Sequence, residues 1–269
     1  MTKLIAALWL ASSLAAATAW AQPFPFNDAG VTMGHWHLNS SDVEANKKIF
    51  VGMGGTAMKP GDFEIVQFPG VIILLHLRPG AAPSTGPTAG TVVNHVGFVV
   101  QNVQESVARW KAAGVPVLPG NNNRLDQAFV VTSDGLRIEI LENKTQKYPI
   151  QHEHVHFFLP EAAIAESQAW YAKTFGAKPG VRNNAAVADI PGVQLRFAKA
   201  DKPMVTTKGR VLDHIGFDVK DLQEFIKKLQ ADGIKLDRPY TKNEQTGDAL
   251  AFITDPWGTY IELNERRPR

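Results

Sequence analysis

The chain has 269 residues, 44% hydrophobic and 20% charged, a composition typical of a globular protein and not of a disordered one. Its net charge is only +2 and its basic residues are scattered, which argues against nucleic acid as a partner. Because it has no cysteine, any metal must be bound through histidine and carboxylate side chains.

The first residues predict an export signal. Lys3 precedes an apolar run over residues 4–17, and Ala19-Trp20-Ala21 has the small-x-small form of a cleavage site. We therefore expect residues 1–21 to be a signal peptide and the mature protein to be secreted or periplasmic. The run is short for a membrane span and no later segment approaches spanning length, so no membrane partner is expected after cleavage.

Four segments of similar order follow, each predicted to contain a strand, a helix and two more strands. Residues 30–79 are expected to hold strands over 31–39, 63–68 and 71–77, with a helix from the capping residues 40–42 to about 51. Residues 91–146 are expected to hold strands over 92–100, 128–132 and 136–141 and a helix over 103–113. Residues 150–200 are expected to hold strands over 151–159, 185–189 and 193–198 and a helix over 161–175. Residues 210–266 are expected to hold strands over 212–219, 249–254 and 259–264 and a helix over 221–231.

A histidine recurs in the first strand of each segment. His35 and His95 are 60 residues apart, as are His154 and His214, and the second pair follows the first at an offset of 119 residues. Equal spacing at both levels indicates a duplicated pair of units. We therefore expect residues 30–146 to form one domain and residues 150–266 to form a second.

Each half also ends with a glutamate in an otherwise apolar strand. Glu139 alternates with isoleucines, and Glu262 alternates with Ile261 and Leu263. Burying an unpaired carboxylate is costly, and a cation beside it would remove that cost. The predicted metal ligands are His35, His95 and Glu139 in the first half and His154, His214 and Glu262 in the second. Two histidines and one carboxylate suit a divalent metal, including Fe(II) with open positions; the plain alternative is that these residues line the solvated face of a sheet.

Two further histidines lie on the same strand faces. His37 and His156 each follow the first presumed ligand by two residues. Either is a candidate ligand, fourth ligand or general base, and each could equally be a hydrogen-bonded polar lining. Arg137 and Tyr260 share a face with the two glutamates, where they could orient a substrate or cover the rim of the sheet.

The repeated phrases resemble a known superfamily. NHVGF and LDHIGF in the first strands, with SDGLRIEILE and TDPWGTYIELNE in the last ones, are similar to the vicinal oxygen chelate (VOC) superfamily of glyoxalases, bleomycin-resistance proteins and extradiol dioxygenases. The resemblance covers about residues 31–265. It implies an α+β fold of four βαβββ modules paired into two domains, each a curved mixed sheet around a cleft. It also implies metal ligands at the six positions given above.

The resemblance further implies a divalent metal ion (Fe(II), Zn, Mn or Ni) and a small substrate bound through two vicinal oxygens. Two departures bear on the reaction. Leu74 and Arg196 stand where glyoxalase I has its fourth ligand, so that set is incomplete unless His37, His76 or His156 substitutes. Phe252 stands where extradiol dioxygenases have a tyrosine.

The favoured function is an exported, glyoxalase-like lyase or isomerase. In it Glu262 or Glu139 would alternate between metal ligand and proton acceptor, with His156 and His37 as further candidate catalytic residues. The alternatives are an extradiol-type ring-cleaving dioxygenase and a non-catalytic ligand-binding protein of the bleomycin-resistance type. Export counts against a thiol-adduct substrate, whereas two complete ligand sets count against a mere binding protein. The second half is expected to matter more for activity, and the assembly to be a monomer or a homodimer.

Overall fold

Each repeated segment folds as a strand, a helix and three further strands. The computed structural model describes residues 24–75 and 84–266, so the predicted signal peptide and His76 lie outside the described residues. Module 1 comprises β1 (Val31–Leu38), α1 (Val43–Met53), β2 (Thr56–Met58), β3 (Ile65–Phe68) and β4 (Val71–Leu74). Module 2 comprises β5 (Val93–Val100), α2 (Val103–Ala112), β6 (Val117–Pro119), a 3₁₀ turn (Asn121–Asn123), β7 (Gln127–Val131) and β8 (Arg137–Glu142).

The second half of the chain repeats this order. Module 3 comprises β9 (Ile150–Leu159), a 3₁₀ turn (Glu161–Ala163), α3 (Ile164–Phe175), β10 (Lys178–Arg182), β11 (Ala185–Ile190) and β12 (Val193–Lys199). Module 4 comprises β13 (Leu212–Val219), α4 (Leu222–Ala231), β14 (Arg238–Lys242), β15 (Ala249–Thr254) and β16 (Tyr260–Glu265). No helix in these described ranges is long and apolar enough to cross a membrane.

Local capping sets the start of three of the four helices. The side chains of Asp42, Asn102 and Asp221 each accept a hydrogen bond from the backbone N–H three residues later, which satisfies one free donor of the first turn. Helix α3 has no such side-chain cap and follows a 3₁₀ turn instead. At its other end Gly176 adopts a left-handed conformation (φ +66°) that stops the helix.

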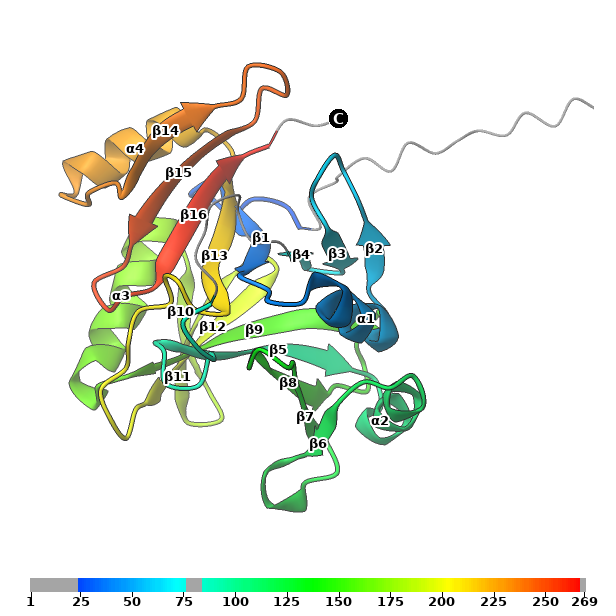
Figure 1. Ribbon diagram of the computed structural model, residues 1–269. Helices are drawn as coiled ribbons and strands as arrows, with labels where there is room; N and C mark the ends of the chain where they lie inside the picture. The colour runs from blue at the N-terminus through cyan, green and yellow to red at the C-terminus, as the bar shows by residue number, and fades with distance from the viewer. Residues whose placement is uncertain (1–23, 76–83, 267–269) are drawn as a thin grey trace, which may run out of the picture.

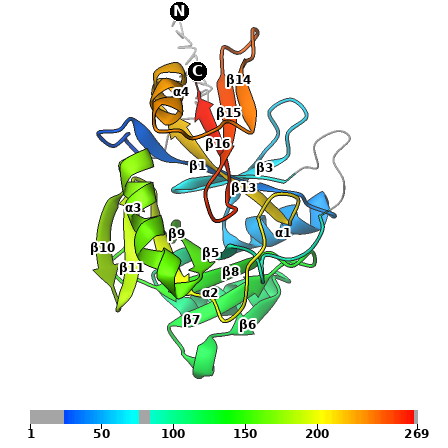
Figure 2. The ribbon, with the colours of Figure 1, turned by 90° about the vertical axis from the view of Figure 1, so that its left-hand side faces the viewer.

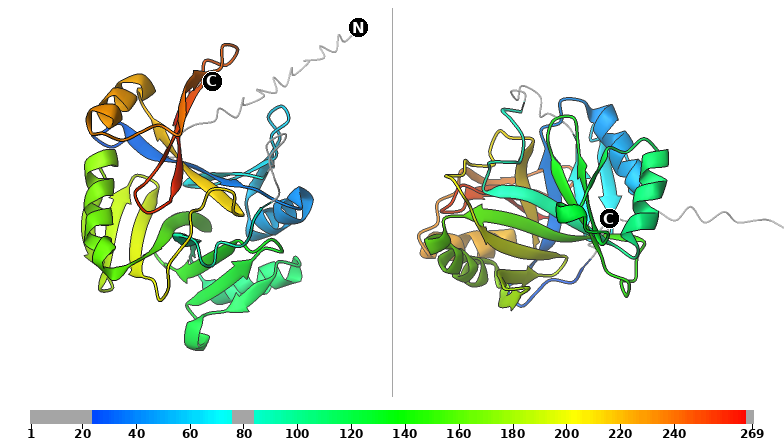
Figure 3. Two further views of the ribbon diagram at one scale, coloured as in Figure 1. Left: turned by 60° about the vertical axis from the view of Figure 1, so that its left-hand side comes forward. Right: turned by 90° about the horizontal axis from the view of Figure 1, so that it is seen from below.

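The strands form two mixed sheets of eight. One has the order β14-β15-β16-β13-β1-β4-β3-β2, and the other has the order β10-β11-β12-β9-β5-β8-β7-β6. Figure 1 shows the first sheet above the second, with α3 and α4 on one side of the molecule and α1 and α2 on the other; Figures 2 and 3 show the same layers from other sides. The predicted α+β fold of four paired modules is therefore confirmed.

The pairing of the modules differs from the prediction. β1 runs antiparallel to β13, so module 1 shares a sheet with module 4, and β5 runs antiparallel to β9, so module 2 shares a sheet with module 3. The predicted domains, residues 30–146 and 150–266, are therefore wrong as sheet units. The physical reason is that the first strand of every module leaves one edge open, and a repeat pattern does not say which other first strand fills it.

Modules that are adjacent in sequence stack face to face instead of side by side. The ring of Trp36 on β1 is fully buried and lies 5.4 Å from the ring of Phe98 on β5, in the next module. It also lies 4.9 Å from the ring of His152 on β9, which is in the same facing sheet but in module 3. Polar contacts also tie each half together: Asn46 on α1 donates to the half-buried Asp134 at 2.8 Å, and Tyr171 on α3 donates to the buried Asp255 at 2.8 Å. The core thus lies between the two sheets.

Candidate metal centres

The sheet of modules 1 and 4 brings three of the predicted ligands together. We call them the β1/β13 cluster: His35 on β1, His214 on β13 and Glu262 on β16. The Nε2 atom of His214 lies 2.8 Å from Oε2 of Glu262, and Nε2 of His35 lies 3.6 Å from the same oxygen. All three side chains are buried, and one donor atom from each lies within 4.8 Å of the others.

The sheet of modules 2 and 3 brings four candidates together. This β5/β9 cluster comprises His95 on β5, Glu139 on β8, and His154 and His156 on β9. Oε2 of Glu139 lies 3.1 Å from Nε2 of His154 and 3.3 Å from Nε2 of His95. Nδ1 of His156 lies 3.0 Å from Nε2 of His95. His156 therefore joins the cluster, as one of its predicted alternatives required.

All six predicted ligands lie in one or other of the two clusters, but they are grouped differently from the prediction. His35 lies with His214 and not with His95, and His154 lies with His95 and not with His214. The predicted triads His35–His95–Glu139 and His154–His214–Glu262 are wrong because the sheets combine modules from opposite halves. The ring of His37 packs 4.6 Å from that of His214, yet its donor atoms are not among those of the β1/β13 cluster.

A glycine makes room for the first histidine of each cluster. His35 faces Gly216 across β1 and β13, and His154 faces Gly97 across β9 and β5. A Cβ atom at either glycine would overlap the imidazole ring opposite it. This explains the His-x-Gly phrase in β5 and β13: the histidine supplies one member of the cluster, and the glycine makes room for the histidine of the partner module.

The neighbouring residues fix the tautomer of three histidines. Nδ1 of His214 lies 2.7 Å from Oδ1 of Asp213, and Nδ1 of His154 lies 2.5 Å from Oε2 of Glu153. Nδ1 of His95 lies 2.9 Å from the amide oxygen of Asn94. Since these oxygens accept hydrogen bonds, each Nδ1 carries the hydrogen and each Nε2 lone pair points toward a glutamate. A metal-binding histidine usually has such an oxygen at its second nitrogen.

The neighbour of Nδ1 in His35 is a hydrogen-bond donor and not an acceptor. Its Nδ1 lies 3.1 Å from Nη2 of Arg266, whose Nε lies 3.1 Å from Oδ1 of Asp218. Arginine only donates hydrogen bonds, so Nδ1 of His35 accepts and Nε2 carries the hydrogen in the neutral ring. The residue before His35 is Gly34, which has no side chain to offer.

The pKa values of the cluster residues follow from burial and from these contacts. Burial acts to raise the pKa of Glu262 and Glu139, but the electrostatic attraction of the two imidazoles beside each holds it below its usual range. Burial lowers the pKa of His35 to about 4, against the opposing effect of Glu262. Burial also acts to lower the pKa of His214, but Asp213 and Glu262 outweigh it and raise the value.

The donor atoms fit a divalent ion. The Nε2 atoms of His35, His154 and His214 are buried and make no hydrogen bond, although each lies within 3.6 Å of a glutamate oxygen. Metal–ligand bonds of about 2.0–2.2 Å at octahedral or tetrahedral angles separate neighbouring donor atoms by about 2.8–3.6 Å. The nitrogen–oxygen separations in the two clusters span 2.8 to 3.6 Å.

Comparison with known proteins agrees with these findings. The sequence model of the Glyoxalase/Bleomycin resistance protein/Dioxygenase superfamily matches residues 154–263. The match covers 110 of the 269 residues, from β9 in module 3 to β16 in module 4. Glyoxalase I from Zea mays has a similar structure, with a TM-score of 0.67 at 15% identity over 87% of this chain and 92% of that one. The putative dioxygenase of Bacillus subtilis subsp. subtilis strain 168 gives a TM-score of 0.64 at 15% identity over 88% and 86%.

The resemblance to the VOC superfamily is thereby confirmed, and the two solved structures establish the fold. No curated protein matches the chain. The two residues that depart from the glyoxalase I pattern lie next to histidines. Leu74 lies beside His37 and Arg196 beside His156 in the parallel strand pairs of the odd modules. Arg196 pairs with Glu153 and donates to Gln194 at 2.7 Å, so the fourth glyoxalase position has no ligand of its own in either cluster.

Aromatic rings line each cluster on the side of its even module. The ring of Phe252 faces Glu262 across β15 and β16 and lies 5.2 Å from the ring of His214, with Tyr260 stacked on it at 4.8 Å. In the other sheet Phe129 faces Glu139, and the guanidinium of Arg137 lies 4.1 Å from its ring centre. Arg137 and Tyr260 thus cover aromatic rings next to the superfamily's ligand positions.

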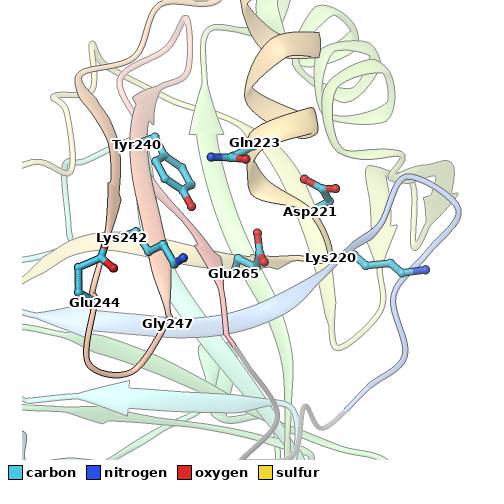
Figure 4. Close-up of a pocket in the computed structure, with 8 residues that line it drawn as sticks. All are labelled: Lys220, Asp221, Gln223, Tyr240, Lys242, Glu244, Gly247 and Glu265. Carbon is cyan, nitrogen blue, oxygen red and sulfur yellow. The ribbon is translucent and has the colours of Figure 1, made fainter.

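Two surface recesses lie elsewhere. One, of about 380 Å³, opens between the start of α4 and the β14–β15 hairpin and is shown in Figure 4. The other, of about 560 Å³, lies between the end of α1 and the start of α2. Their linings contain none of the seven cluster residues, and the first is made mainly of exposed charged side chains.

Proposed function

We propose that the mature protein is a metal-dependent enzyme that binds a small substrate through two vicinal oxygens and acts as a glyoxalase-like lyase or isomerase. The observation that carries the proposal is the convergence of two imidazole nitrogens and a carboxylate oxygen in each sheet, with an oxygen acceptor behind three of the four histidines. A divalent ion (Fe(II), Zn, Mn or Ni) held there would act as a Lewis acid on the two substrate oxygens.

The residues around each cluster have defined roles in this proposal. Glu262 and Glu139 are the only carboxylates within the clusters, so each is the candidate to accept a proton from the substrate. Their depressed pKa values keep them ionised at neutral pH. Asp213 and Glu153 hold the imidazoles of His214 and His154 in the tautomer that leaves Nε2 open.

The aromatic lining favours this reaction class over ring cleavage by oxygen. The position expected to carry a tyrosine in an extradiol dioxygenase is Phe252, and the equivalent position in the other sheet is Phe129. A phenyl ring gives and takes no proton. The dioxygenase is therefore the second candidate, and simple ligand binding without turnover is the third.

The test is a pair of assays on the chelator-stripped mature protein, reloaded separately with Fe(II), Zn, Mn or Ni. We expect metal-dependent turnover of a small compound with two vicinal oxygens, with no oxygen uptake; an α-ketoaldehyde thiol adduct serves as the reference substrate. Oxygen uptake with catechols would support the dioxygenase instead. Tight binding of such compounds without turnover, whatever the metal, would contradict the enzyme proposal.

Export remains part of the proposal. Cleavage after Ala21 would place the enzyme outside the cytoplasm, where the thiol-adduct substrates of cytoplasmic glyoxalases are not expected. Expression of the full chain in a bacterium, followed by N-terminal sequencing of the periplasmic fraction, should find a chain that begins at Gln22. Recovery of uncleaved chain in the cytoplasm would contradict it.

A further inference from the structure

The two clusters differ in one histidine. In each sheet a second histidine of the odd module packs on the ligand histidine of the even module: His37 lies 4.6 Å from His214, and His156 lies 4.5 Å from His95, measured between ring centres. Only His156 has a donor atom within the set of converging atoms. We propose that His156 is a fourth ligand, so that the β5/β9 cluster holds its metal through three imidazoles and one carboxylate. This inference rests on the proposed function.

The hydrogen bond between His156 and His95 cannot persist once an ion is bound. Nδ1 of His156 and Nε2 of His95 are 3.0 Å apart, and Asn94 keeps the hydrogen of His95 on its Nδ1. Without an ion, Nδ1–H of His156 can donate to the lone pair of His95. An ion that takes this lone pair removes the acceptor, so the His156 ring must present its own Nδ1 lone pair to the same ion or move away.

The surroundings of His156 favour coordination over movement. The ring is packed against His95 and against Phe158, whose ring centre lies 5.1 Å away, and its Nε2 is buried. The separation of 3.0 Å is also that of adjacent ligands on an ion with bonds of about 2.1 Å.

The neighbouring strand β12 explains why a fourth coordination position is free in the β5/β9 cluster. In the parallel pair of β9 and β12 the residue beside His156 is Arg196, at the fourth ligand position of glyoxalase I. Its guanidinium turns to Glu153 and Gln194 and supplies no lone pair. His156 is therefore placed to supply the ligand atom that Arg196 does not supply at this position.

The proposal makes the two centres chemically different. Four protein ligands leave two positions on a six-coordinate ion, which is enough for two vicinal oxygens of a substrate and nothing more. Three protein ligands in the β1/β13 cluster leave a third open position. The β5/β9 centre is thus restricted to Lewis-acid chemistry on a bidentate substrate.

The experiment titrates chelator-stripped mature protein with Co²⁺, whose visible spectrum reports its ligands. We expect two ions per chain in the natural protein. His156→Ala should weaken one of them at least tenfold and leave the other unchanged, which also reports that the variant is folded. His37→Ala, the matched control, should change neither by more than about twofold.

Cysteine variants give the decisive signal. His156→Cys should add a sulfur-to-cobalt charge-transfer band, because a thiolate at a ligand position bonds the ion directly, whereas His37→Cys should add none. If both alanine variants weaken binding equally, or if His156→Cys gives no band while two ions still bind, His156 is a packing residue and the inference fails, although the proposed function stands. If the natural protein binds no Co²⁺, Zn²⁺ or Mn²⁺, the proposed function and the inference fail together.

Discussion

The two sheets offer a comparison within one chain, because the same repeated strand builds a cluster in each. Both clusters have a histidine from each of two modules, a glutamate from the even module and a glycine opposite the first histidine. They differ in the residues beside the ligands. His154 is preceded by Glu153, which fixes its tautomer, whereas His35 is preceded by Gly34 and faces Arg266. The repeat thus determines which residues converge in each sheet. The residues next to the histidines determine whether each imidazole is held in the tautomer that can bind a cation.

The largest expected effect tests which residues share an ion. His95→Ala and His154→Ala should each lose the same ion, so the double variant should still bind one metal per chain in the β1/β13 cluster. His95→Ala combined with His35→Ala should bind none, because it disables both sheets. Metal content after dialysis, measured by mass spectrometry, tests this. If the double variant with His35→Ala and His95→Ala retained one ion, the grouping predicted from sequence would be correct.

The next effect concerns the glycines that admit the histidines. Gly97→Ala and Gly216→Ala should each abolish metal binding in their own sheet, because the new Cβ overlaps the ring of His154 or His35. Overpacking should also lower the free energy of unfolding by about 1–3 kcal/mol. Urea unfolding and metal content measure the two effects. Gly180→Ala is the control, since its Cβ would meet only Val187 at 3.6 Å; unchanged metal content in the first two variants would disprove the explanation.

A smaller effect is expected from the residues behind the ligands. Glu153→Ala should weaken the β5/β9 ion, and Asp213→Ala the β1/β13 ion, by about 10–100-fold each, because the imidazole loses the acceptor that orients it. Competition with a coloured chelator gives both affinities. Glu161→Ala, which removes only an exposed partner of Lys199, should leave both affinities as they are.

Arg266 should act in the opposite direction. Arg266→Gln removes a positive charge from beside Nδ1 of His35, so the β1/β13 affinity should rise by about twofold to fivefold. The β5/β9 affinity is the internal control and should stay constant. A fall in β1/β13 affinity would mean that Arg266 supports the cluster through its ion pair with Asp218, and would contradict the unfavourable role assigned to Arg266.

The weakest effect is on stability against acid. The pKa of Glu139 and of Glu262 in the folded protein lies below the ordinary value of 4.5, so the stability that they contribute is present above pH 4.5 and is lost as the pH falls below it. In metal-free protein the urea midpoint should therefore fall less between pH 5 and pH 3.5 in Glu139→Gln and Glu262→Gln than in the natural chain. An equal fall in all three would contradict this assignment.

Much of the fold could be predicted from the sequence because its central strands and helices carry strong patterns. The helix over 221–231 and the strand over 249–254 agree with α4 and β15 to within one residue. The strands that the pattern misses, β2, β6, β10 and β14, are edge strands or lie at the ends of the sheets. β10 and β14 are largely exposed, so their residues do not alternate in polarity.

The site residues could be predicted, but their grouping could not. A histidine or glutamate at a fixed place in a strand is a local property of the sequence. For this reason the pattern picks out all six residues that the clusters share with the prediction, which are His35, His95, His154, His214, Glu139 and Glu262. Strand pairing across modules is a tertiary property, and four equivalent first strands give no local sign of their partners. One sign was present: Gly97 and Gly216 leave space for a ring that their own modules do not supply. The acceptors Asp213, Glu153 and Asn94 were missed, although each directly precedes a ligand.

The central claim is that each metal centre is assembled from modules at distant places in the chain. Anomalous diffraction from a crystal of mature protein soaked in Zn²⁺ tests it most directly. We predict two peaks, one among His35, His214 and Glu262 and one among His95, Glu139, His154 and His156. Absence of both peaks, or a peak joining His35 to His95, would contradict the account.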